Sequence, residues 1–171
     1  DVKINELLDR LRHETTQAVL SRDDVVVVAS VSCIYNIGSP LNYEKLSIQI
    51  SEGQPMKQKE FLKHLVTLQY QRNQLEKAPG TFSAKGETVF VYPAGGNDVI
   101  RVVFGKNNIE DIYTASDYLE PAWQKISRVR IFPAKFWLSE QKTIPLAIVN
   151  IKNELAEELK TLESVHKLLE A

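Results

Sequence analysis

The chain has 171 residues, enough for one domain with a substantial core or for one domain with pieces of its neighbours. Hydrophobic residues make up 43% of it and charged residues 25%, so it is expected to fold. A net charge of −1 gives no whole-chain argument for nucleic-acid binding. The single cysteine, Cys33, excludes an intrachain disulfide and favours a cytoplasmic location. No apolar run approaches the length of a membrane span, so no membrane partner is expected.

The first forty residues combine a helix with an isolated strand pattern. Apolar residues recur at helical spacing over residues 3–21 and predict an amphipathic helix. Residues 25–29 form a β-branched run without alternation, which is typical of a strand buried on both faces of a parallel sheet. Since no other segment resembles a parallel partner, we expect the rest of that sheet to lie outside these 171 residues.

The middle of the chain is expected to form a small sheet with a helix packed on it. Ser39 and Pro40 predict the start of a short helix, residues 46–50 alternate as a strand does, and residues 57–72 predict a second helix. The expected strands are residues 81–85 and 88–92, joined by a turn at Gly86-Glu87, and then residues 99–104, 109–113 and 128–132. This pattern predicts an α+β fold with a mostly antiparallel sheet.

A long helix is expected at the end of the chain, with Thr143 as its N-cap and Pro145 in its first turn. Its apolar stripe consists of Ile148, Ile151, Leu155, Leu159, Leu162 and Leu169. A stripe of this length exceeds what the small sheet can cover. It is therefore expected to pack on a partner, on a missing domain, or on a second copy through residues 144–170.

No set of residues in the sequence predicts catalysis. There is no phosphate-binding glycine loop, and no histidine and acid are placed to activate Ser30, Ser32 or Cys33. A zinc site would require the three histidines and Cys33 to converge, so no metal is expected. We therefore expect no enzymatic activity and no cofactor in these residues.

Three cations in the middle of the chain are candidates for a binding surface. Residues 51–104 carry seven Lys or Arg against five Asp or Glu, a local net charge of +2. Arg101 alternates with Val99 and Val103 on one face of its strand, where apolar neighbours would strengthen a charged contact. Arg72 and Lys85 lie nearby in the sequence. The alternative is that all three are simply solvated cations on a sheet.

Several blocks of this sequence resemble the UvrB family, whose members are the damage-verifying proteins of the bacterial excinuclease ABC system in nucleotide excision repair. They are residues 4–13 (INELLDRLRH), 28–35 (VASVSCIY), 68–73 (LQYQRN), 80–82 (GTF), 131–134 (IFPA) and 168–171 (LLEA). The resemblance runs through the whole chain in order. It implies a domain, inserted between helicase-type domains, that binds the partner protein UvrA.

The resemblance also implies a domain layout. Residues 1–38 would belong to the first helicase-type domain, 39–127 to the inserted UvrA-binding domain, and 128–171 to a return segment and long helix leading back to the helicase body. The ATP-binding loop, the DNA-gripping hairpin and the remaining helicase motifs would then lie outside this chain. UvrC, damaged DNA and ATP would be partners of the longer protein.

In the family, basic residues of the inserted domain meet an acidic surface of UvrA. The matching positions are Arg72, Ser83, Lys85 and Arg101. The family's Arg-x-Arg is Ser83-Ala84-Lys85 here, and lysine cannot form the two-pronged carboxylate contact of arginine. The contact is therefore expected to depend more on Arg72 and Arg101.

Two alternative functions remain open. A related UvrA-binding module occurs in transcription-repair coupling factors, although the SVSCIY block fits UvrB better. A DNA-binding or strand-separating enzyme in its own right is disfavoured by the net charge and by the missing phosphate loop.

Overall fold

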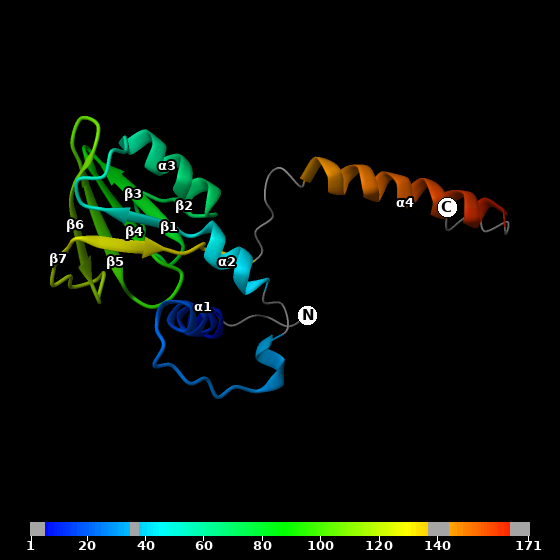
Figure 1. Cartoon of the computed structure of the whole chain (residues 1–171), viewed down its shortest axis with the longest axis horizontal. Coiled ribbons are helices and arrows are strands. Elements are labelled where there is room, and N and C mark those ends of the chain that lie inside the picture. Colours follow the sequence, from blue (N-terminus) through cyan, green and yellow to red (C-terminus); the bar gives the residue numbers. More distant parts are fainter. Residues whose placement is uncertain (1–5, 35–37, 137–143, 165–171) are drawn as a thin grey trace. The chain divides into compact units, whose positions relative to one another are not determined.

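A computed structural model describes residues 6–34, 38–136 and 144–164 (Figure 1). The chain divides into two compact units, residues 1–138 and 139–171. The first unit contains the helices α1 (Glu6–Ser21), α2 (Pro40–Leu46) and α3 (Gln58–Thr67) and a short 3-10 turn, η1 (Val31–Ile34). Its strands are β1 (Ile48–Ser51), β2 (Gln71–Arg72), β3 (Thr81–Lys85), β4 (Thr88–Tyr92), β5 (Val99–Phe104), β6 (Ile109–Ala115), β7 (Gln124–Ile126) and β8 (Arg128–Ile131). The second unit contains α4 (Ile144–Ser164).

The predicted α+β fold is confirmed. A six-stranded sheet has the order β2-β3-β4-β5-β6-β7, and all its neighbours are antiparallel except the short parallel pair β2–β3. The β3–β4 hairpin has the predicted bounds, and Gly86 in its turn has φ +60°, which favours glycine. β8 pairs with β1 in a separate two-stranded sheet. The sequence analysis missed β7 and also β2, which it placed in the helix expected over residues 57–72. The domain boundaries at residues 38 and 127 stay a prediction.

One face of the sheet is closed by α3 (Figure 1). Phe61 and Leu65 on α3 are fully buried against alternate strand residues, and the Phe61 and Phe104 rings lie 5.4 Å apart. Other members of this core are Phe82, Val89, Val91, Ile100, Val102, Ile112, Ile50 and Ile131. Because strand side chains alternate between faces, the residues between these point to the opposite side of the sheet. α3 does not cover that opposite side of the sheet.

The helix expected over residues 57–72 ends early, at Thr67. Gln69 adopts φ +66°, the amide of Tyr70 donates to the carbonyl of Leu65, and that of Gln69 donates to Val66 (both 3.0 Å). These bonds form a Schellman motif, which reverses the chain and directs Tyr70 back into the core beside Leu65. The left-handed position is usually glycine. A glutamine there explains why the sequence did not predict the stop.

The strand expected at residues 25–29 is not formed. Val26 and Val28 are 90% and 96% exposed, and the segment has no regular structure. β-branched residues favour a strand only where a neighbouring strand pairs with them. No strand of the described chain lies beside this run.

α1 is fastened to the rest of its unit by buried contacts. His13 is buried, stacks on Phe136 with ring centroids 3.9 Å apart, and places Nδ1 3.0 Å from the Tyr43 hydroxyl. On its other side α1 approaches the turn after β4. A Cβ on Gly95 would lie 2.9 Å from the backbone nitrogen of Glu14, so the approach requires glycine there. Cys33, in η1, is half-buried and lies 3.7 Å (Sγ) from the Ser30 hydroxyl.

α4 is amphipathic and has Pro145 in its first turn, as predicted. Ile148, Ile151 and Leu155 on its stripe are 47%, 62% and 57% exposed. The predicted cap Thr143 and the last stripe residue, Leu169, lie outside the described residues. Within the described part of the chain, no helix is both long and apolar enough to cross a membrane.

We expect this 171-residue chain to self-associate through the α4 stripe, because that would bury its exposed apolar side chains. Light scattering should give a concentration-dependent mass above that of the 19.4 kDa monomer. Leu155→Glu combined with Leu162→Glu should restore the monomer mass, whereas Glu154→Gln should not. A monomer mass for the unmodified chain at about 100 μM would contradict this expectation.

Candidate functional site

The side of the sheet not covered by α3 carries a row of side chains that crosses five strands. The register aligns Ser83 on β3 with Phe90 on β4, Arg101 on β5, Tyr113 on β6 and Lys125 on β7. Lys85 lies two residues from Ser83, so it faces the same way. We call these six residues and Trp123 the open face. The structure thus brings together three of the four predicted site residues: Ser83, Lys85 and Arg101.

Arg101 is held between two aromatic rings. Its guanidinium carbon lies 4.0 Å from the ring centre of Tyr113 and 4.6 Å from that of Trp123. Both contacts are cation–π interactions, which strengthen as the charge loses water. The side chain is half-buried, and its Nε is buried without a hydrogen-bond partner. The sequence predicted a partly desolvated arginine, but it did not predict the rings that hold it.

The open face contains one cation that is neutralised and two that are not. Lys125 Nζ lies 2.7 Å from Asp111 Oδ1 and 2.9 Å from Glu52 Oε1. Its hydrogen bond lowers the pKa of Asp111, and the charge of Arg101 contributes more weakly in the same direction. Among the described residues, no salt bridge includes Lys85 or Arg101. These two side chains therefore remain available to an acidic partner.

A groove adjoins Arg101 on the open face. It has a volume of about 360 Å³ and lies over β3, β4 and β5, between the loop after β2 and the loop before β7. It is lined by Asn73, Gln74, Leu75, Glu76, Lys77, Ser83, Lys85, Phe90, Tyr92, Val99, Tyr118, Pro121 and Trp123. Burial raises the pKa of Tyr92, although a hydrogen bond with Ser83 acts in the opposite direction. Ser83 lines the groove together with Tyr92.

Arg72 lies apart from the other predicted residues. It is exposed on the edge strand β2, in register with Phe82, whose side chain belongs to the core under α3. Residues paired in register point to the same side of a sheet, so Arg72 faces away from Ser83, Lys85 and Arg101. A partner docked on the open face would reach Arg72 only by wrapping around the β2 edge.

Lys77 and Trp123 were missed by the sequence analysis. Lys77 Nζ donates to the carbonyl of Tyr118 (3.1 Å), linking the two loops that border the groove. The ring of Trp123 contacts Phe90, with centroids 6.1 Å apart, as well as Arg101. Trp123 lies in a loop that has no strand or helix pattern. Its position beside Arg101 depends on the β6–β7 pairing, which no pattern in the sequence indicates.

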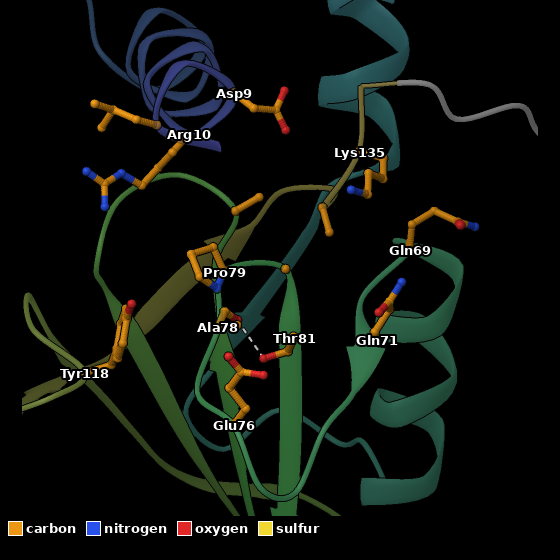
Figure 2. A pocket seen from close by; sticks show the side chains of 14 residues that line it. Asp9, Arg10, Gln69, Gln71, Glu76, Ala78, Pro79, Thr81, Tyr118 and Lys135 are labelled. Atoms are coloured by element: carbon orange, nitrogen blue, oxygen red, sulfur yellow. Dashed lines mark hydrogen bonds between the residues drawn. The ribbon is translucent and has the colours of Figure 1, made fainter. Parts of the chain in front are cut away.

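A second cavity, of about 530 Å³, lies between α1 and the start of β3 (Figure 2). Its charged lining is balanced: Asp9 and Glu76 are acidic, whereas Arg10 and Lys135 are basic. The Thr81 hydroxyl there donates to the carbonyl of Ala78 (2.6 Å), the bond drawn in Figure 2. No cluster of metal-ligating side chains occurs in the described residues. With no excess charge, this cavity is a weaker candidate than the open face.

Comparison with known proteins gives one family. The UvrB interaction domain family matches residues 48–137, which include every strand of the six-stranded sheet. The whole chain is 42% identical to the UvrABC system protein B of Methanothermobacter thermautotrophicus and 40% identical to that of Chloroflexus aggregans, over 171 residues each. It is 40% identical to that of Clostridium botulinum over 172 aligned positions. The chain spans about a quarter (26%) of the length of each of these relatives. The chain belongs to the UvrB family and contains its interaction domain.

Proposed function

We propose that the open face docks UvrA during nucleotide excision repair. The name of the matched domain, and the UvrABC system in which the relatives are named, support a role in binding another protein of that system. The observation that carries the proposal is Arg101, which is partly desolvated, lies between two aromatic rings, and makes no salt bridge in the described chain. Such a guanidinium is preorganised for a carboxylate on an acidic surface.

Lys85 and Lys77 extend the positive charge along the groove beside Arg101. Complementary charges of this kind speed encounter and fix orientation more than they increase affinity. Because Ser83 is uncharged, the open face offers less charge than the Arg-x-Arg pattern of the family would. Arg101 is therefore the central contact, and Arg72 is a peripheral one at the sheet edge.

We further propose that ATP binding, contact with damaged DNA and contact with UvrC belong to the remainder of the longer protein. The 26% coverage of the relatives leaves most of their length for these activities. The chain itself then acts as a binding module in the cytoplasm rather than as an enzyme.

The docking proposal predicts a salt-dependent complex with UvrA of the same organism. Calorimetry should show the Kd rising about tenfold or more between 50 and 300 mM NaCl, because salt screens charges near the surface. Lys85→Glu should weaken binding about tenfold at low salt and reduce the salt dependence. The matched control is Lys59→Glu on α3, on the opposite side of the sheet. Absence of binding at 50 mM NaCl, or a Kd independent of salt, would refute the proposal.

A further inference from the structure

The groove on the open face is mainly apolar at the place where the docking cations meet. Six of its lining residues are large and apolar or aromatic: Leu75, Phe90, Tyr92, Val99, Tyr118 and Trp123. Tyr92 and Tyr118 meet edge to face, with centroids 5.8 Å apart, and so form one wall. Five of these residues, all except Leu75, also pack against one another in a small hydrophobic cluster on this side of the sheet, so Leu75 is the fully exposed apolar member of the lining.

Leu75 is the most exposed large apolar residue of the described chain, at 99%. Its loop is nevertheless well fixed. Asn73 Oδ1 accepts hydrogen bonds from the amides of Leu75 (3.0 Å) and Glu76 (3.1 Å), and Gln74 Nε2 donates to the carbonyl of Ala84 (3.2 Å). With the Lys77 bond to Tyr118, these contacts tie the loop at both ends. The ordered loop thus holds the Leu75 side chain outward at the edge of a groove whose other walls are aromatic, where a docked partner would bury it.

The volume of the groove and the charges along its rim indicate what kind of group can bind in it. A volume of about 360 Å³ is near the lower limit for ligand sites and suits one or two large side chains better than a cofactor. Lys77 and Lys85 line the groove together with one acid, Glu76, and Arg101 contacts the same Trp123 ring. The charges at the rim therefore complement carboxylates, while the interior complements an apolar side chain.

We propose that the groove receives a large apolar side chain from an acidic segment of the partner protein, with adjacent carboxylates on Lys85 and Arg101. The inference rests on the proposed docking function and adds an apolar anchor to it. Leu75 packs over the inserted side chain, and Phe90 and Trp123 form its floor. The small, uncharged side chain of Ser83 leaves the groove open to this side chain.

The test uses the 171-residue chain, UvrA of the same organism, and calorimetry at several temperatures. Leu75→Ala should weaken binding about fivefold and make the heat-capacity change of binding less negative, because less apolar surface is buried. Ser83→Trp, which fills the groove, should weaken binding about tenfold or more. Leu41→Ala is the matched control, because Leu41 is 76% exposed on α2 and does not line the groove. Circular dichroism should show an unchanged fold for all three variants.

The outcomes separate the two proposals. If Leu75→Ala and Ser83→Trp both bind within twofold of the unmodified chain while Arg101→Glu abolishes binding, the apolar anchor is wrong and the docking function stands. If Arg101→Glu leaves the affinity unchanged, the docking function fails. Aromatic residues beside cations also suit single-stranded DNA, so a labelled oligothymidine is a further probe. Saturable oligothymidine binding at 150 mM NaCl that is lost in Trp123→Ala would overturn the assignment to a protein segment.

Discussion

Arg101→Glu is expected to weaken the complex with UvrA by about 100-fold or more, the largest effect of any single substitution on the open face. Removing one partner of a desolvated charge pair costs about 2–5 kcal/mol, and reversing the charge adds repulsion from the acidic surface. The half-buried position of Arg101 between Tyr113 and Trp123 is what makes the contact strong. The measurement is the Kd by calorimetry at about 100 mM NaCl.

Arg101→Lys tests the contribution of the positive charge separately from that of the planar guanidinium group. Lysine keeps the positive charge but lacks the planar group that stacks between two rings and meets a carboxylate in two places. We expect an intermediate loss, of about tenfold, together with a salt dependence similar to that of the unmodified chain. The matched control for the charge reversal is Arg128→Glu, on the exposed side of β8 in the two-stranded sheet. An Arg101→Glu chain that folds and binds within twofold of the original would exclude Arg101 from the interface.

The sequence predicted those parts of the fold that depend on neighbours in the chain. The β3–β4 hairpin follows from alternating side chains and a glycine at the turn, and both act over a few residues. The end of α3 did not follow, because a glutamine takes the left-handed position that usually marks a helix end. The strand predicted at residues 25–29 was wrong for a related reason, since a strand requires a partner that the sequence pattern cannot supply.

In the candidate site, too, only the features that depend on neighbours in the sequence were predicted. Alternation along β5 was enough to place Arg101 beside Val99 and Val103. By contrast, its contact with Trp123 depends on a pairing between β6 and a three-residue strand. Arg72 lies close to Lys85 in the sequence, but its side chain faces the other side of the sheet and is not part of the open face. Cross-strand register, which no local pattern encodes, decides which cations share a surface.

The contact between α1 and the segment after β8 should make the stability of the chain depend on pH. The Tyr43 hydroxyl donates to the carbonyl of Pro133 (3.1 Å) and accepts from Gln17 Nε2 (3.0 Å). Its one proton is therefore used, so His13 Nδ1 donates to the Tyr43 oxygen. The neutral Nδ1–H tautomer and the imidazolium can both donate this bond, so it is the burial of the ring, and not this bond, that favours the neutral form. Burial lowers the pKa of His13 from 6.5 to about 4, against the opposing charge of Asp9 and assisted by Lys135 and Arg12.

The pKa of His13 is lower in the folded chain than in the unfolded chain. At pH values between these two pKa values, the unfolded chain therefore binds one proton more than the folded chain. The stability contributed by neutral His13 is thus complete above pH 6.5 and is lost as the pH falls toward 4. The shift corresponds to about 3 kcal/mol, enough to lower a urea midpoint by more than 1 M. His13→Phe keeps the stack on Phe136 but cannot take up a proton, so its midpoint should fall much less between pH 7 and pH 4. His64→Gln, at an exposed position on α3, is the control and should leave the pH dependence of the urea midpoint unchanged. If the midpoint of His13→Phe falls with pH as much as that of the unmodified chain, protonation of His13 does not control this contact.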